Sequence, residues 1–220
     1  MRISLDAKAS VRVGDFSRRG KKRLPVKAAD HDFRPTASVT PVGILVPQTD
    51  ERFLACVTSK VTSDWLVDVL DQCWQRVRAR CEHIRTLVIN LDNGPENHSH
   101  RTQFLNRLVA FAQTSQLTVT LASDPPYHST YHPVERCWGI LENHWNGDVL
   151  DSVETVLAFA QTMTCKGNPP VVQLLTTIYH TGVRLSKKAM AEVETHVQRL
   201  IGLERWFGDI SCVPPASPDT

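Results

Sequence analysis

Three acidic residues stand where a carboxylate can do chemistry. Asp6 lies within the apolar segment RISLDA, and Asp92 directly follows the apolar run TLVINL. Glu135 follows a proline at the start of the amphipathic segment HPVERCWGILENHW. A charge in a buried strand is unfavourable unless it is paired or binds a metal. Because Mg²⁺ and Mn²⁺ favour carboxylate oxygens, the three acids together predict a divalent-metal site.

Such a site predicts phosphoryl-transfer chemistry. Two ions about 3.5–4 Å apart can activate a water or hydroxyl and stabilise the leaving oxygen of a phosphodiester. We expect two ions, Mg²⁺ or Mn²⁺, with Asp6 and Asp92 bridging or chelating them and Glu135 holding one from its helix. No nucleophilic side chain is then required.

Each acid also has a simpler interpretation. Asp6 can belong to a polar strand edge that faces water, and Asp92 can cap the end of its strand. Glu135 can be a helix N-terminal acid that the helix dipole favours. Glu96 and Glu142 are competing acids, and we rank Glu142 second because it lies two turns beyond Glu135. The hypothesis therefore depends on the three acids meeting at one edge of a sheet.

Hydrophobic patterning predicts the elements that position these acids. The segments that read as strands are 2–13, 37–47, 51–59, 86–91 and 117–123. The segments that read as helices are 61–81, with Thr62 or Ser63 as N-cap, 101–116, 132–145, 152–163, 170–181 and 186–202. Residues 86–91 are apolar on both faces, which is typical of a central strand in a covered sheet. Pro133 fits the first turn of its helix.

This order predicts an α/β fold. The three leading strands can pair antiparallel, whereas the strand–helix–strand units that follow require a parallel, right-handed arrangement. We expect a mixed sheet of about five strands flanked by helices, with extra helices toward the C-terminus. The core should occupy residues 1–150, a packed helical extension residues 151–212, and a disordered tail residues 213–220.

Composition excludes several classes of protein. Hydrophobic content is 41% and charged content 22%, which are globular values. No stretch approaches the roughly 18 apolar residues of a membrane helix, and the N-terminus lacks the apolar region of a signal peptide. The six cysteines form no CxxC pair, so we interpret them as reduced thiols without a zinc site. We expect a cytoplasmic protein without a membrane partner.

Positive charge gathers near the N-terminus. Residues 1–35 hold ten Lys or Arg against four acids, whereas the remaining 185 residues hold fifteen against nineteen. We predict that the densest part contacts DNA phosphates, through Arg18, Arg19, Lys21, Lys22 and Arg23. A solvated loop is the alternative. His128 and His132, in the loop before Glu135, are further candidates for DNA contact, and loop packing is the alternative for them.

Several of these segments resemble a known family. LDNGPEN around Asp92 and PPYHSTYHPVERCWGILENHW around Glu135 resemble the pattern of DDE transposases, and DNGPE also resembles retroviral integrases. ISLDAKASV, PVKAADHDF, VTSDW and SVETVLAFAQTM are similar to the bacterial insertion-sequence group called Rhodopirellula-type transposase DDE domains, within the mariner-like and integrase superfamily. The resemblance covers nearly the whole chain.

The resemblance implies an RNase H-like fold and metal-dependent DNA transposition. Family members cut DNA at element ends and join the freed 3′-hydroxyls to target DNA. Carried over by position, the triad is Asp6, Asp92 and Glu135, with 42 residues between the last two. The implied partners are DNA and, in the active state, further copies of the chain, at the bacterial nucleoid.

Two features depart from the family pattern. His132 stands where many relatives have asparagine before the proline. Full-length members also carry an N-terminal helical DNA-binding region, for which nothing ahead of Asp6 is a candidate, so we expect a catalytic domain alone. The alternatives are a catalytically silent remnant that only binds DNA or a partner, and a nuclease of the same fold without strand transfer.

Overall fold

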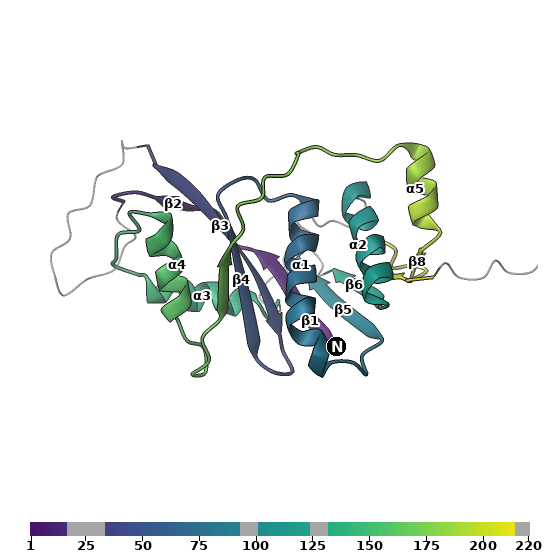
Figure 1. The fold of residues 1–220 in the computed structure, drawn as a ribbon, viewed down its shortest axis with the longest axis horizontal. Coiled ribbons are helices and arrows are strands. Elements are labelled where there is room, and N and C mark those ends of the chain that lie inside the picture. The colour runs from purple at the N-terminus through teal and green to yellow at the C-terminus, as the bar shows by residue number, and fades with distance from the viewer. Residues whose placement is uncertain (17–33, 93–100, 124–131, 214–220) are drawn as a thin grey trace, which may run out of the picture. The chain divides into compact units, whose positions relative to one another are not determined.

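The computed structural model describes residues 1–16, 34–92, 101–123 and 132–213, which form two compact units. Unit 1 consists of Met1–Leu5, Val61–His132 and Tyr179–Thr220, and unit 2 of Asp6–Lys60 and Pro133–Ile178. The strands in these residues (Figure 1) are β1 (Arg2–Ala7), β2 (Val11–Val13), β3 (Ala37–Val46), β4 (Glu51–Val57), β5 (Thr86–Leu91), β6 (Thr118–Ser123), β7 (Val171–Leu174), β8 (Val197–Arg199) and β9 (Phe207–Ile210). The helices are α1 (Ser63–Val77), α2 (Thr102–Ser115), α3 (Glu135–His144), α4 (Val153–Thr162) and α5 (Lys187–Glu194), with a 3₁₀ turn at Arg78–Arg80.

The strands of unit 1 form a mixed sheet. The first residues of β1 pair in parallel with β5, and Leu5 lies opposite Leu91. β5 also pairs in parallel with β6, whereas β6 pairs antiparallel with β9, and β9 with β8. Every residue of β5 after Thr86 is buried or half-buried. The predicted central strand at 86–91 is therefore confirmed, with the bounds that the sequence indicated.

Helices α1 and α2 lie side by side on one face of the unit 1 strands (Figure 1). The hydroxyl of Thr62 accepts a hydrogen bond from the backbone N–H of Trp65 at 3.2 Å, which confirms one of the two predicted N-caps. Arg107 on α2 makes ion pairs with Asp64 and Asp68 on α1, at 3.1 and 2.5 Å. The amphipathic pattern and these charges together fix α1 against α2.

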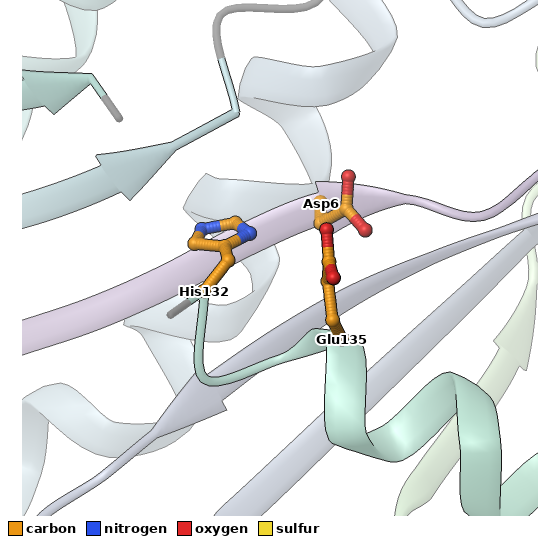
Figure 2. A group of neighbouring side chains, drawn as sticks. All are labelled: Asp6, His132 and Glu135. Atoms are coloured by element: carbon orange, nitrogen blue, oxygen red, sulfur yellow. The ribbon is translucent and has the colours of Figure 1, made fainter. Parts of the chain in front are cut away.

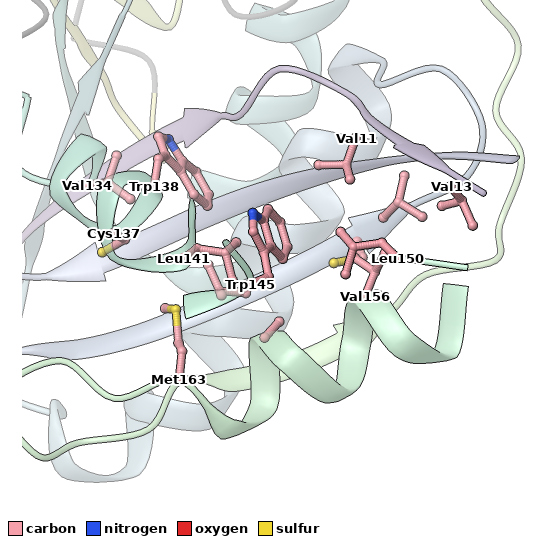
Figure 3. Close-up of a cluster of buried hydrophobic side chains, with 14 of the residues drawn as sticks. Val11, Val13, Val134, Cys137, Trp138, Leu141, Trp145, Leu150, Val156 and Met163 are labelled. Atoms are coloured by element: carbon pink, nitrogen blue, oxygen red, sulfur yellow. The ribbon is translucent and has the colours of Figure 1, made fainter. Parts of the chain in front are cut away.

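Unit 2 is built around the predicted hairpin. β3 and β4 pair antiparallel on either side of a turn at residues 47–50, and β2 pairs antiparallel with β3. β7 adds a parallel strand to β4. Helices α3 and α4 supply Trp138, Leu141 and Val156 to a buried cluster with these strands, and Met163, just after α4, joins it (Figure 3). Each fully buried side chain of this size contributes about 1.5–3 kcal/mol to folding.

Three of the expected elements were wrong or incomplete. Residues 2–13 are two strands, because β1 ends at Ala7 and β2 begins only at Val11. Residues 171–174 form strand β7 where a helix was expected, and their adjacent valines fit a strand that pairs with β4. In 186–202 the helix α5 ends at Glu194 and strand β8 follows. The mixed α/β fold itself is confirmed, whereas the boundary predicted at residue 150 stays a prediction.

Candidate metal centre

Asp6 lies near the end of β1 and is buried. The residue is only 6% exposed, and Ser4 on the same face is fully buried, so these two side chains do not meet water. The indole Nε1 of Trp138 donates a hydrogen bond to Oδ2 of Asp6 at 2.5 Å, within unit 2. A buried carboxylate that meets a polar donor is typical of a functional or structural charge rather than of a solvated strand edge.

Glu135 is the first residue of helix α3. Val134 is the N-cap, so Pro133 lies just before the helix and not in its first turn as predicted. This position lets the helix dipole favour the negative charge of Glu135. The residue is half-buried. The helix therefore presents a carboxylate at the end that also carries the unsatisfied backbone N–H groups.

Asp6, His132 and Glu135 come together (Figure 2). Each offers one ligand atom, a carboxylate oxygen or an imidazole nitrogen, and these atoms lie within 4.8 Å of one another. In Figure 2 the carboxylates of Asp6 and Glu135 point toward each other. Within the part of the chain that the structure describes, no other group of three His, Cys, Asp or Glu side chains has this closeness.

His132 is buried, and one of its nitrogens has no hydrogen-bond partner within the described part of the chain. The residue is 1% exposed, and Nε2 lies 3.2 Å from the backbone oxygen of Asn90. Because a carbonyl only accepts, Nε2 donates in this contact, and in the neutral tautomer that fits it the lone pair is on Nδ1. Among the described residues Nδ1 has no hydrogen-bond partner. This burial does not favour the DNA contact predicted for His132.

The three side chains fit a divalent cation. Two carboxylates supply negative charge and hard oxygen ligands, which Mg²⁺ and Mn²⁺ prefer. Nδ1 of His132 is a buried polar atom that no described residue hydrogen-bonds, and a cation would satisfy it. A nitrogen ligand makes the set less purely oxygen than three acids would be, and imidazole is a more usual ligand for transition metals than for Mg²⁺.

Asp92 follows the end of β5 and is exposed. It is not a member of the group in Figure 2. The register of unit 1 nevertheless relates it to Asp6, since each acid comes directly after one of the paired residues Leu5 and Leu91. Its part in the predicted triad stays a prediction.

A family model for the Rhodopirellula transposase DDE domain matches residues 1–212. The chain belongs to this family. No curated protein matches the transposase domain. None of the helices in its described residues is both long and apolar enough to cross a membrane.

Two solved structures of the Mos1 transposase are similar to the domain. One is a paired-end complex with the left transposon end, with 13% sequence identity and a TM-score of 0.49. The other is the Mos1 mariner paired-end complex with Mn, with 14% identity and a TM-score of 0.50. Each match covers 70% of this chain and 45% of the solved chain. The second likeness supports the mixed, RNase H-like fold that the sequence predicted.

Several predicted residues lie outside the described part of the chain. These are the basic run of Arg18, Arg19, Lys21, Lys22 and Arg23, the loop residue His128, and the competing acid Glu96. Glu142 is described and is not a member of the group of Asp6, His132 and Glu135. Its partners are Lys8 at 2.6 Å and the indole of Trp145 at 2.8 Å. Its rank behind Glu135 stays a prediction.

The cysteines have no part in the group. All six lie in described residues, and none forms a disulfide. Burial raises the pKa of Cys56 to about 12 and also raises the pKa of Cys137. Thiols of this kind stay protonated at neutral pH.

Trp138 contacts a predicted metal ligand, and the sequence analysis gave it no role at this centre. It is 8% exposed and packed in the cluster of unit 2, but its N–H bonds a predicted metal ligand. One signal was available, since a buried tryptophan usually finds a partner for its N–H. A second signal is its place three residues after Glu135, on the same helix face.

Proposed function

We propose that this domain catalyses the DNA strand cleavage and strand transfer of transposition, using divalent metal. The observation that carries the proposal is the grouping of the buried Asp6 carboxylate, the Glu135 carboxylate and Nδ1 of His132, which no described residue hydrogen-bonds. Membership of the DDE transposase family supports the same reading.

Asp6 and Glu135 would hold the cation from β1 and from the start of α3, and Nδ1 of His132 would add a nitrogen ligand. Asp92 is the proposed third acid. The strand register supports this role. Asp6 and Asp92 directly follow Leu5 and Leu91, which are paired in parallel. Neighbouring parallel strands lie about 4.8 Å apart and end at the same edge of a sheet. A second ion is proposed on the same acids.

A bound divalent ion supplies Lewis-acid stabilisation of phosphate charge and a nucleophile of lowered pKa. The side chains of this chain would bind the ion, orient the reacting groups and neutralise their charge. In cleavage, a water oxygen bonds to phosphorus and the water loses a proton, while the bond to the 3′-oxygen breaks and that oxygen takes up a proton to leave as a 3′-hydroxyl. In joining, that hydroxyl forms the new bond to a target phosphorus and the target's own 3′-hydroxyl leaves. Both steps need no covalent protein intermediate.

The proposed substrate is DNA, as element ends and as target. The surplus of ten basic against four acidic residues in 1–35 supports a phosphate-contacting segment, in which Arg18, Arg19, Lys21, Lys22 and Arg23 are the proposed contacts. His128 stays a proposed contact as well. Assembly with further copies of the chain is proposed from the family pattern of acting on two element ends.

The test is nicking and joining of supercoiled plasmid DNA by the purified chain with Mn²⁺. We expect Asp6→Asn, Asp92→Asn and Glu135→Gln each to abolish the nicking that the wild type shows. Glu142→Gln is the matched control, because it neutralises an acid of the same helix outside the group, and it should nick normally. Equal nicking by the Asp92→Asn variant and the wild type would remove Asp92 from the triad. A wild type without any nicking would favour the catalytically silent alternative.

A further inference from the structure

Two tryptophans of unit 2 each donate an indole hydrogen bond to an acid. Trp138 on α3 bonds Oδ2 of Asp6 at 2.5 Å, and Trp145, just after α3, bonds Oε2 of Glu142 at 2.8 Å. Both tryptophans belong to the same buried cluster, where both are labelled in Figure 3. Only Asp6 is also a member of the group in Figure 2.

The indole of Trp138 is held in place by packing. Strand β3 carries Gly43 opposite it, and a Cβ at that position would lie 2.7 Å from Cη2 of Trp138 and 3.0 Å from Cγ2 of Val134. Because glycine has no side chain, the indole ring of Trp138 can occupy this space. Because the ring is packed into this space, the indole N–H of Trp138 has little freedom to turn away from Asp6.

The bond also suits a carboxylate that must bind a cation. An indole N–H is a donor only, so it stabilises the charged form of the acid without competing for the cation. A carboxylate has about four acceptor positions, and one such bond occupies one of them. Glu135 and Trp138 are three residues apart on α3, so one helix face presents both a proposed ligand and the group that orients another.

We propose that Trp138 is a positioning residue, which fixes the carboxylate of Asp6 in the orientation that binds the divalent cation. This inference rests on the proposed function, because it needs Asp6 to be a metal ligand. Partners that orient metal ligands through a hydrogen bond typically change metal affinity by about 10–100-fold when they are lost.

The test compares Trp138→Phe with Trp145→Phe in the full chain. Both changes keep an aromatic ring and remove one indole N–H that bonds an acid. Both also remove side-chain volume from the same buried cluster. We expect both to lower the urea midpoint by similar amounts. The dissociation constant for Mn²⁺, from the electron paramagnetic resonance signal of free Mn²⁺, should rise roughly 10–100-fold for Trp138→Phe. For Trp145→Phe the Mn²⁺ dissociation constant should stay within about twofold of the wild-type value, because a change at an independent site has little effect on binding.

A second measurement needs no metal. The indole ¹H–¹⁵N resonance of Trp138 should move in Asp6→Asn and stay in Glu142→Gln, while that of Trp145 should do the reverse. If the Trp138 resonance ignores Asp6→Asn, the hydrogen bond is absent and the inference is overturned.

The two proposals fail in different ways. If the wild type binds Mn²⁺ and both phenylalanine variants weaken it equally, Trp138 only packs, and the metal centre stands without it. If the wild type binds no Mn²⁺, the proposed metal site fails and the positioning role fails with it.

Discussion

The two indole–carboxylate pairs of unit 2 use the same chemistry in opposite surroundings. Asp6 is 6% exposed and meets Trp138, whereas the Glu142 side chain is 45% exposed and meets both Trp145 and the ammonium of Lys8. Water and a nearby cation make the charge of Glu142 inexpensive. Burial makes the charge of Asp6 costly unless something at its site requires it. The difference separates an acid kept for folding at the surface from one kept for a function.

Neutralising each acid in turn should give the largest contrast. At a Mn²⁺ concentration of 100 times the dissociation constant, the wild type should gain about 2.7 kcal/mol in the free energy of unfolding. Asp6→Asn should lose almost all of that gain, because a proposed ligand becomes a neutral amide. Glu142→Gln should keep it. Urea unfolding with Mn²⁺ and with a chelator measures both.

Metal-free stability sharpens the same comparison. Asp6→Asn removes a buried charge beside the Glu135 carboxylate, so the metal-free protein should unfold at the same urea concentration or a higher one. If Asp6→Asn clearly lost metal-free stability and kept its stabilisation by Mn²⁺, the buried acid would serve folding. Asp6 and Glu142 would then not differ in role.

The sequence indicated the elements of this centre well, and its contacts poorly. The strand 86–91 and the N-cap Thr62 were predictable because apolar runs and caps are local signals. Strands β7 and β9 were not, because each forms only by pairing with a strand far away in the chain. The bond from Trp138 to Asp6 spans 132 residues, and no local pattern encodes such a distance.

Gly43 shows the same limit at one residue. Within β3 it reads as a weakness in a strand, since glycine has no side chain to pack. The structure explains why glycine stands at this position, because the ring of Trp138 occupies the space where a Cβ would be. A glycine of this kind can be interpreted only when the residue from the other element is known.

Two alanine substitutions therefore test how the Asp6 side of the comparison is held. Gly43→Ala places a Cβ 2.7 Å from Trp138, and we expect it to lower the free energy of unfolding by about 1–3 kcal/mol and to weaken Mn²⁺ binding. Gly139→Ala is the matched control on α3, where a Cβ meets nothing within 4 Å. It should stabilise the helix by roughly 0.5–1 kcal/mol and leave Mn²⁺ binding unchanged. Urea titration and Mn²⁺ titration of both variants give the two readouts.

If Gly43→Ala destabilised the protein while the Mn²⁺ dissociation constant stayed at the wild-type value, the position of the indole would not control Asp6. Equal effects of the two substitutions would mean that Gly43 is not the space-making residue. Either result would reduce the pair of Trp138 and Asp6 to an ordinary buried hydrogen bond, like many others in a core.

The smallest effect is expected on the exposed side. Lys8→Met keeps an unbranched side chain of similar length and removes the ion pair with Glu142, so the free energy of unfolding should fall by no more than about 1 kcal/mol. Salt at 1 M shortens the screening length to roughly 3 Å and should remove much of that difference. Mn²⁺ binding should not change, because Glu142 lies outside the group of Asp6, His132 and Glu135. A tenfold weaker Mn²⁺ affinity in Lys8→Met would instead couple Glu142 to the metal centre, and the two acids would then have to be treated as one site.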